Sequence, residues 1–384
     1  MKTGLDRLLE GALGSTLAGV RIALASNESA RDGRGRPSAD CCLEAGLKVE
    51  RLLAPEHGFD LALPEGQRFG PGRHPRLGLP VAPFYGDGLV LTPEALDGAE
   101  VLLFDLPNVG LRCHTYLANL VEAVRYCASH ATALVVLDRP NTLGGLAVEG
   151  PPAGEPFLSD VAPVPLPFRH GLVWSELVQW LLRTLPARLE PRCVPMQGWR
   201  REQWHDATGL SWAAPSPNLR TFDAAVAYPA TVWLEATTLS EGRGTAQPFE
   251  WFGAPWLRPG PALRALEALE LPGVAFAETE FVPARSKHVG AHCAGLALRV
   301  VDRALYRPLE TGLTLLQTLR DPAVCGFEWM RGARTGICFV DRLAGTDRLR
   351  LALEEGRSAR ELAAEFAREA RAFDAHRREF LLYE

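Results

Sequence analysis

The chain has 384 residues, of which 47% are hydrophobic and 23% charged, a composition typical of a folded globular protein. Lys and Arg number 41 against 46 Asp and Glu, so the net charge of -5 provides no basic field for binding nucleic acid. The eight cysteines form no CxxC pair and no run of about 18 apolar residues occurs, which argues against a zinc cluster, a disulfide framework and a membrane span. We therefore expect a cytoplasmic protein with reduced thiols and with neither nucleic acid nor membrane as a partner.

The first half of the chain alternates apolar stretches with helical patterns. Five stretches are predicted as strands: 20–26, 49–55, 100–107, 133–140 and 192–196. Three stretches between them are predicted as helices: 38–48, 117–130 and 174–185. Short apolar strands that alternate with helices indicate an α/β fold with a parallel sheet and crossover helices.

The second half of the chain has a different character. Residues 206–260 are rich in Pro, Gly, Trp and Thr, which indicates long loops. Helices are then predicted at 261–270, 308–320 and 357–380, and a strand at 295–303. We place a domain boundary near residue 205, which divides the chain into an α/β domain (1–205) and a smaller α+β domain (206–384).

Polar residues follow three of the predicted strands: Glu56 and His57, then Asp105 and Asn108, then Asp138, Arg139 and Asn141. In open α/β sheets, ligands bind outside the carboxyl ends of the strands, and all three clusters would lie at that edge. Glu56 is a candidate general acid, with a pKa raised by a partly apolar setting. The alternative is that these are ordinary exposed or structural strand-end residues.

Two further segments of the first half carry candidate site residues. Arg112, His114 and Tyr116 alternate along the chain, so an extended segment would point them to one face. His170 directly precedes a predicted helix, where a capping role is the alternative to a place in the cleft. Beyond them, the proline-set loop 214–221 presents Asn218 in a fixed position.

The densest group of unusual residues lies between residues 234 and 256. This stretch carries Glu235, Ser240, Glu241, Arg243, Thr245 and Glu250, followed by Trp251, Phe252 and Trp256. Gly242 and Gly244 allow close backbone approach. Carboxylates for hydroxyls, a guanidinium for an anion and indoles for a sugar face are suited to binding a carbohydrate. The alternative is a loop that packs on the first domain.

Taken together, these stretches resemble the exo-β-N-acetylmuramidase family of NamZ-like peptidoglycan glycosidases. The matching segments are APEHGF (54–59), LLFDLPNVGLRCHTY (102–116), VLDRPNTLGGLAVEGP (136–151), APSPNL (214–219) and YPATVWLEATTLSEGRGTAQPFEWFGAPW (228–256). The resemblance implies a Rossmann-like first domain, a smaller second domain and an active site in the cleft between them. It also implies removal of a terminal β-linked N-acetylmuramic acid from peptidoglycan fragments during cell-wall turnover, with a small carbohydrate as partner and no cofactor.

The resemblance also assigns roles to residues. Glu56 becomes the leading candidate for an essential catalytic carboxyl, most simply the general acid. Glu241 and Glu235 are candidates for the second carboxyl role or for hydroxyl binding, and Arg243 or Arg139 is a partner for the lactyl carboxylate of the sugar. The expected substrate-binding residues are His57, Asp105, Asn108, Arg112, Tyr116, Asp138, Arg139, Asn141, His170, Asn218, Glu235, Arg243 and Thr245.

Three positions depart from the family pattern, which usually has Gln, Asp and Tyr where this chain has Pro107, Asn108 and His114. Because an amide at Asn108 cannot act as a base, two alternatives stay open: a non-catalytic sugar sensor, and a hydrolase for another N-acetyl or acidic sugar. The sequence leaves retention, inversion and assistance by the acetamido group equally open.

Overall fold

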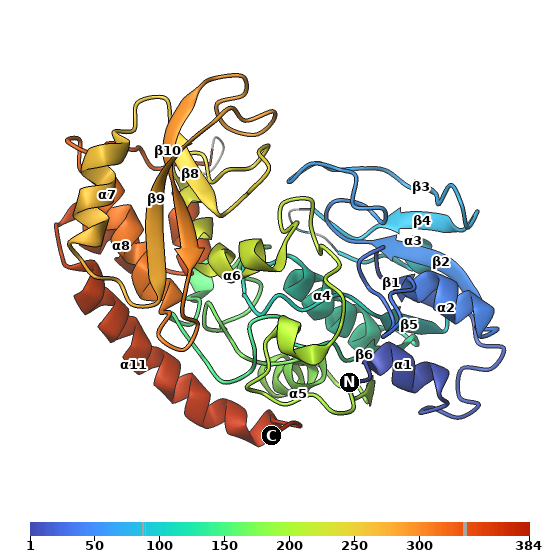
Figure 1. Cartoon of the computed structure of the whole chain (residues 1–384). Coiled ribbons are helices and arrows are strands. Elements are labelled where there is room, and N and C mark those ends of the chain that lie inside the picture. Colours follow the sequence, from blue (N-terminus) through green and yellow to red (C-terminus); the bar gives the residue numbers. More distant parts are fainter. Residues whose placement is uncertain (87, 89, 333–335) are drawn as a thin grey trace.

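The structure, a computed structural model, describes residues 1–86, 88, 90–332 and 336–384. Figure 1 shows two lobes. We call the part with strands β1–β7 and helices α1–α5 the first lobe, and the part with helices α6–α11 and strands β8–β10 the second lobe. In the described ranges, no helix is long and apolar enough to cross a membrane.

The first lobe is built on a seven-stranded sheet with the order β3-β4-β2-β1-β5-β6-β7. Its strands are β1 (Ile22–Ala25), β2 (Val49–Ala54), β3 (Gly72–Arg73), β4 (Pro80–Pro83), β5 (Val101–Phe104), β6 (Ala133–Leu137) and β7 (Arg192–Val194). All neighbouring strands are parallel except β3, which runs antiparallel to β4. The chain builds one side of the sheet from β1 to β4 and then returns to the other side of β1 with β5, which creates a topological switch point between β1 and β5.

Helices cover both faces of this sheet. They are α1 (Gly4–Leu9), α2 (Ser38–Glu44), α3 (Pro93–Leu96), α4 (Tyr116–Ser129) and α5 (Trp174–Thr184), with a 3₁₀ turn at Glu155–Phe157. Leu102 and Phe104 pack in one apolar cluster with α3, α4 and α5, whereas Val101 and Leu103 pack in another with α1 and α2. Successive strand residues face opposite sides, so a strand buried on both faces must be apolar throughout.

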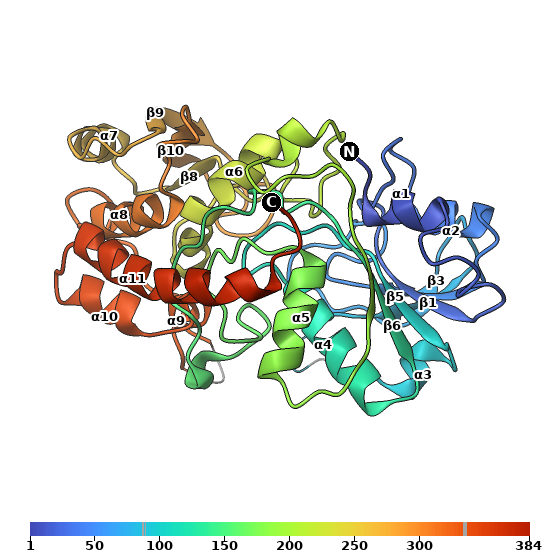
Figure 2. The same ribbon diagram turned by 90° about the horizontal axis from the view of Figure 1, so that it is seen from below.

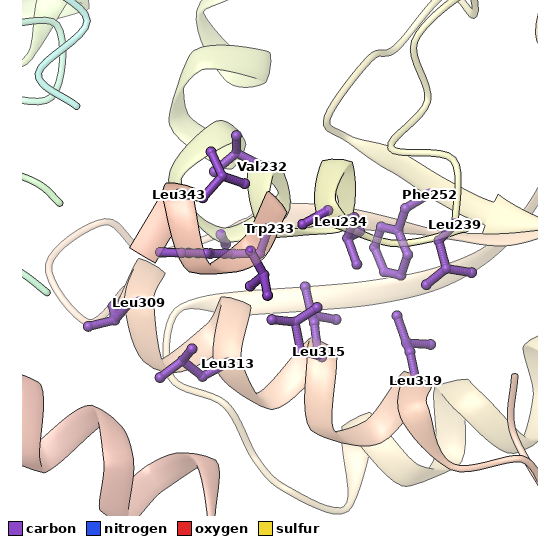
Figure 3. Packing of buried hydrophobic residues seen from close by; sticks show 14 of the residues in the cluster. Val232, Trp233, Leu234, Leu239, Phe252, Leu309, Leu313, Leu315, Leu319 and Leu343 are labelled. Atoms are coloured by element: carbon purple, nitrogen blue, oxygen red, sulfur yellow. The ribbon is translucent and has the colours of Figure 1, made fainter. Parts of the chain in front are cut away.

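The second lobe holds a three-stranded antiparallel sheet with the order β8-β10-β9. Its strands are β8 (Trp251–Ala254), β9 (Val274–Phe281) and β10 (Cys293–Val300). Its helices are α6 (Phe222–Thr231), α7 (Pro259–Glu267), α8 (Pro308–Arg320), α9 (Phe339–Ala344), α10 (Arg348–Glu354) and α11 (Ala359–Arg377), with 3₁₀ turns at His205–Thr208, Val232–Ala236 and Arg378–Phe380. Figure 3 shows Trp233 and Leu234 above Leu313, Leu315 and Leu319 of α8, in the middle of the apolar core of this lobe.

The two lobes share this core. Leu111, Leu143 and Phe168 of the first lobe belong to the same buried cluster, and the rings of Phe168 and Trp233 lie 4.3 Å apart. Figure 2 shows α11 crossing from the second lobe toward α5. Its Phe373 meets Trp180 of α5 edge to face, at 6.1 Å between the ring centroids. The wall between the lobes is therefore a packed interface.

The predicted parallel sheet is confirmed, since all five predicted strands and the three intervening helices are present. The helices predicted in the second half correspond to α7, α8 and α11, and the predicted strand corresponds to β10. Strands β4, β8 and β9 and helix α6 were not predicted. The boundary near residue 205 stays an interpretation: the large sheet ends at Val194 and the small one begins at Trp251.

Candidate active site

A small cavity of about 40 Å³ lies between the loops at the carboxyl edge of the large sheet and the second lobe. We call it the Glu56 cavity. It is lined by Glu56, His57, Glu65, Cys113, His114, Thr115, Ser216, Leu219, Tyr228, Arg243 and Phe249. A cavity of about 580 Å³ shares Ser216 with it, and one of about 340 Å³ shares Thr115. Two cavities large enough for a sugar therefore border the Glu56 cavity, one at Ser216 and one at Thr115.

Glu56 lies two residues beyond the end of β2, and the chain reverses after it because His57 and Gly58 have positive φ angles of 73° and 79°. The returning loop places the Gly66 N–H 3.0 Å from Oε1, and the Thr115 hydroxyl donates to Oε2 at 2.8 Å. Burial opposes ionisation, but His57 and these two hydrogen bonds outweigh it and lower the pKa of Glu56. The expected raised pKa is therefore wrong, and Glu56 is a carboxylate at neutral pH.

Two histidines, His57 and His114, lie in the cavity wall. His57 Nδ1 lies 2.9 Å from the carbonyl oxygen of Leu63, so this nitrogen carries the proton and Nε2 is left as an acceptor. Burial lowers the pKa of His57, and it lowers that of His114 to about 4. The ring of His114 meets Tyr116 edge to face, with 4.4 Å between the centroids. These rings shape the cavity beside Glu56.

A cluster of four charged residues stands behind the cavity wall: Glu241, which is buried, and Glu235, Arg243 and Lys287, which are partly buried. Arg243 is ion-paired with Glu235, and its Nη1 donates to Glu241 Oε1 at 2.9 Å. Lys287 Nζ lies 2.9 Å from Glu241 Oε2. Burial raises the pKa of Glu235 to about 7, whereas Lys287 and Arg243 overcome the burial of Glu241 and lower its pKa to about 2.

Of these four residues, only Arg243 is among the residues described as lining the Glu56 cavity. Glu241 is 1% exposed, and both of its carboxylate oxygens are bound to cations. The structure therefore corrects the expected catalytic role of Glu241: its carboxylate holds Arg243 and Lys287 in place and does not reach the cavity.

The loop that carries Arg243 depends on its two glycines. Gly242 has a φ of 77°, and a Cβ atom there would lie 2.4 Å from the carbonyl oxygen of Trp251. Gly244 has a φ of 80°, and its Cβ would lie 2.6 Å from the backbone of Arg285. The expected close backbone approach is confirmed, and it brings residues 240–245 against the loop between β9 and β10.

The predicted polar residues do gather at the sheet edge, but most of them bind one another. Arg139 makes a two-pronged ion pair with Asp105, at 2.6 and 2.7 Å. Asn108 and Asn141 both donate to the carbonyl oxygen of Leu172, at 3.0 and 3.1 Å. These four side chains are buried and hold the loops after β5 and β6 in place.

Four more of the predicted residues are also bound internally. Arg112 is wholly buried and donates to three backbone carbonyls, at 2.5 to 2.9 Å. Asp138 accepts hydrogen bonds from a backbone N–H of α5 at 2.7 Å and from the Tyr383 hydroxyl at 2.6 Å. His170 Nδ1 accepts from a backbone N–H at 3.1 Å, and the Tyr116 hydroxyl donates to a backbone carbonyl at 2.5 Å. None of these polar groups reaches the described lining of the Glu56 cavity.

Across the cleft, the loop after β2 is tied to the second lobe by Glu65, which the sequence analysis missed. Asn218 Nδ2 donates to Glu65 Oε2 at 3.2 Å, and Arg285 Nη2 donates to Asn218 Oδ1 at 2.7 Å. Thr245 lines the cavity of about 580 Å³ and donates to the carbonyl oxygen of Gly242 at 2.6 Å. No motif marks Glu65 or Arg285, because 220 residues of chain separate these partners and only folding brings them together.

The aromatic residues expected to receive a sugar face lie elsewhere. Phe252 is buried in the core of the second lobe. The ring of Trp251 stacks on Phe281, and Trp256, 44% exposed, meets His288 edge to face. In the described wall of the Glu56 cavity, the aromatic side chains besides the histidines are Tyr228 and Phe249.

Comparison with known proteins connects this site to one family. Residues 22–223 match the family described as "Exo-beta-N-acetylmuramidase NamZ, N-terminal", and residues 226–383 match its C-terminal counterpart. The peptidoglycan beta-N-acetylmuramidase NamZ of Bacillus subtilis (strain 168) is 34% identical over 384 residues, which cover 100% of this chain and 91% of that protein.

Crystal structures of two DUF1343 family proteins from Bacteroides fragilis have similar folds. Their TM-scores are 0.88 and 0.77 at 26% and 25% identity, and each comparison covers 100% of this chain and 99% of the other. The sequence resemblance and the mixed α/β fold are thereby confirmed. Since the two family matches together span residues 22–383 almost without a gap, the chain belongs to the exo-β-N-acetylmuramidase NamZ family.

Proposed function

We propose that this chain hydrolyses the bond to a terminal, non-reducing β-linked N-acetylmuramic acid in peptidoglycan fragments, with Glu56 as the catalytic carboxylate. Membership of the NamZ family supports the glycosidase activity. The observation that carries the assignment to Glu56 is the ionised carboxylate, held by Gly66 and Thr115 at the edge of a cavity between two lobes.

An ionised carboxylate fits one of the two roles that carboxyl groups have in glycoside hydrolysis. In that chemistry, one group donates a proton to the leaving oxygen, and another, as a carboxylate, meets the positive charge at the anomeric carbon or activates water. Glu56 has the second role, because its hydrogen bonds stabilise the ionised form. Glu65, the other carboxyl in the described wall, is engaged with Asn218, and Glu235 lies behind Arg243.

Substitution of Glu56 by Gln tests this assignment. The amide keeps the size and one acceptor oxygen but loses the negative charge, so we expect turnover of a chromogenic β-N-acetylmuramic acid glycoside to fall by about 10²-fold or more. Calorimetric affinity for N-acetylmuramic acid should change by less than about tenfold. Glu50→Gln is the matched control, since Glu50 lies on the same strand, 43% exposed and paired with Lys48. Full turnover by Glu56→Gln would refute the assignment.

The alternative of a non-catalytic sensor rested on Asn108. Its amide is 1% exposed, is bound to Leu172 and Gly110, and lies outside the described lining of the Glu56 cavity. The substitution therefore removes no carboxylate from that cavity. A different sugar specificity is tested by assaying the N-acetylglucosamine glycoside beside the muramic one.

We also propose a cytoplasmic location, where muramic-acid-containing fragments would be recycled. All eight cysteines are free thiols, and seven of them are buried. Free thiols are the usual state of cysteine in a reducing compartment, which supports this proposal. Fractionation of cells that produce the tagged protein, with a periplasmic and a cytoplasmic marker, tests it.

A further inference from the structure

The cavity of about 580 Å³ beside the Glu56 cavity has arginine in its wall and no carboxylate. Arg220 and Arg285 line it, and none of its described lining residues is Asp or Glu. It meets the Glu56 cavity at Ser216. We call it the arginine vestibule. Two guanidinium groups that face an open cavity with no acidic side chain in its wall attract an anion.

Both arginines keep donors for a ligand. Arg220 is exposed, and its guanidinium makes no ion pair within the ranges that the structure describes. Arg285 is 34% exposed; its Nη2 donates to Asn218, while its Nη1 lies 3.9 Å from Glu65 Oε2, at the outer limit of an ion pair. A guanidinium has five N–H donors, so each can still bind a carboxylate through two of them.

The arginines that the sequence analysis assigned to the lactyl carboxylate are already neutralised. Arg243 is ion-paired with Glu235 and Glu241, and Arg139 with Asp105. Binding another anion there would require a buried ion pair to break, which is costly. In the vestibule, Arg220 has no ion pair to break within the described ranges, and Arg285 has only a long contact of 3.9 Å with Glu65.

Another described cavity, of about 870 Å³ beside α11, provides a useful contrast. Its wall also contains arginines, but Arg169 pairs with Glu149 at 2.8 Å and Arg303 with Asp206 at 2.7 Å. Its positive charge is therefore balanced locally. The cavity of about 340 Å³, which shares Thr115 with the Glu56 cavity, also contains an arginine, Arg125, but its wall holds Glu122 and Asp160 as well, whereas the described wall of the arginine vestibule holds no carboxylate.

Glu65 lines the Glu56 cavity and reaches toward Arg285 of the vestibule. Its carboxylate accepts from Asn218 at 3.2 Å and faces Arg285. Although burial opposes ionisation of Glu65, Arg243 and these neighbours lower its pKa, so a negative charge already sits at this point. A carboxylate brought by a substrate would compete with Glu65 for the same donors.

We propose that the arginine vestibule is a subsite for a carboxylate carried by the substrate, bound by Arg220 and Arg285 in competition with Glu65. The carboxylate is either the lactyl group of the muramic acid or an acidic residue of a peptide attached to it. This subsite rests on the proposed function, because it places an acidic substituent next to a sugar held at Glu56.

The test is calorimetric binding, which needs no turnover. Three probes are compared: N-acetylmuramic acid, its lactyl amide, and N-acetylmuramic acid bearing L-Ala-D-Glu. The Arg220→Gln/Arg285→Gln protein should bind the lactyl acid roughly tenfold more weakly, since a charged hydrogen bond contributes about 1.5–3 kcal/mol and tenfold corresponds to about 1.4 kcal/mol. Its affinity for the amide should be unchanged. Arg299→Gln, an exposed residue of β10, is the control.

The probes also distinguish the two sources. If the arginines bind the lactyl group, the double variant loses affinity for the free acid and not for the peptide form. If they bind the peptide carboxylates, the double variant loses more affinity for the peptide form. Glu65→Gln should tighten binding of the anionic probe by several-fold, because the competing charge is gone. Equal affinity of the wild type and the double variant for both anionic probes, or weaker binding by Glu65→Gln, would overturn the proposal.

Failure of the subsite and failure of the proposed function have different signatures. Turnover of the muramic glycoside by the wild type, with affinity independent of Arg220 and Arg285, removes the subsite alone. Arginine-dependent binding without turnover removes the proposed activity and keeps the subsite. An absence of binding of all three probes to the wild type overturns the subsite.

Discussion

At the scale of single residues, Asn108 shows how a departure from the family pattern at the sheet edge affects the stability of the fold. Its Nδ2 donates to the carbonyl oxygen of Leu172 at 3.0 Å, and its Oδ1 accepts from the Gly110 N–H at 2.9 Å. An ionised Asp at this position would have no donor and would face that carbonyl oxygen. An unpaired buried polar group costs more than a hydrogen bond contributes, so the amide is favoured here.

We therefore predict that Asn108→Asp lowers the free energy of unfolding by about 1–3 kcal/mol. The turnover per folded molecule should stay within roughly twofold of wild type, because the Glu56 cavity is not lined by this side chain. Urea unfolding at pH 7 and active-site titration measure the two quantities. Asn141→Asp, which loses a donor to the same carbonyl oxygen, should behave similarly. A gain in turnover by Asn108→Asp would contradict this interpretation.

At the scale of elements, the site depends on two loops of the second lobe that touch through their backbones. Gly244 lies against Arg285, and only the absence of a side chain allows this approach. The contact holds Arg243, which precedes Gly244, and Arg285, which lines the arginine vestibule, in fixed positions. Gly244, which itself lines the vestibule, therefore helps to position two guanidinium groups, those of Arg243 and Arg285.

Replacing Gly244 by Ala should lower the free energy of unfolding by more than the positive φ angle alone accounts for. Ala at a φ of 80° costs about 1–2 kcal/mol by itself, and the overlap with Arg285 should add about 1–3 kcal/mol. We also expect the Michaelis constant for the muramic glycoside to rise. Gly209→Ala is the matched control, because Gly209 has a φ of 76° and no atom within 4 Å of its Cβ position. Equal destabilisation by both changes would argue against the overlap.

At the scale of the whole molecule, the end of the chain fastens the second lobe to the first. After α11, the Tyr383 hydroxyl donates to Asp138 Oδ2 at 2.6 Å, and Arg377 donates to the carbonyl oxygens of Gly145 and Gly171 at 2.9 and 2.7 Å. Asp138 directly follows β6, so this contact ties the last residues to the edge of the large sheet. Burial raises the pKa of Asp138 to about 7, while the Tyr383 hydrogen bond opposes that shift.

Tyr383→Phe should therefore destabilise the protein in a way that depends on pH. In the wild type, the pKa of Asp138 is higher in the folded state than in the unfolded state. Its contribution to stability is therefore largest below about pH 4 and is lost as the pH rises toward 7. Removing the hydroxyl raises the folded pKa further and extends that loss above pH 7, at about 1.4 kcal/mol per pKa unit.

Thermal unfolding of both proteins between pH 5 and 9 measures this effect. The difference in stability between the wild type and Tyr383→Phe should grow with pH. In an Asp138→Asn background, the deficit should be the same at every pH, because the titrating carboxyl is gone. A deficit that is independent of pH with Asp138 present would refute the linkage.

The sequence by itself predicted the large sheet because a strand buried on both faces must be apolar along its whole length, as in residues 22–25 and 101–104. It failed for β4, where prolines at both ends hide the strand, and for α6, which contains Pro229. These elements form because neighbouring strands and helices pack on them, and that information is not local.

For the site, the sequence determined that Glu56 and His57 would follow a strand at the carboxyl edge, and the family resemblance indicated the chemistry. The tertiary structure decided that Glu56 is ionised, because His57 and hydrogen bonds from Gly66 and Thr115 outweigh its burial and lower its pKa. It also decided which guanidinium groups are available, because Arg139 and Arg243 meet buried carboxylates whereas Arg220 faces an open cavity. Charge and protonation depend on partners distant in the chain, so only the folded arrangement settles them.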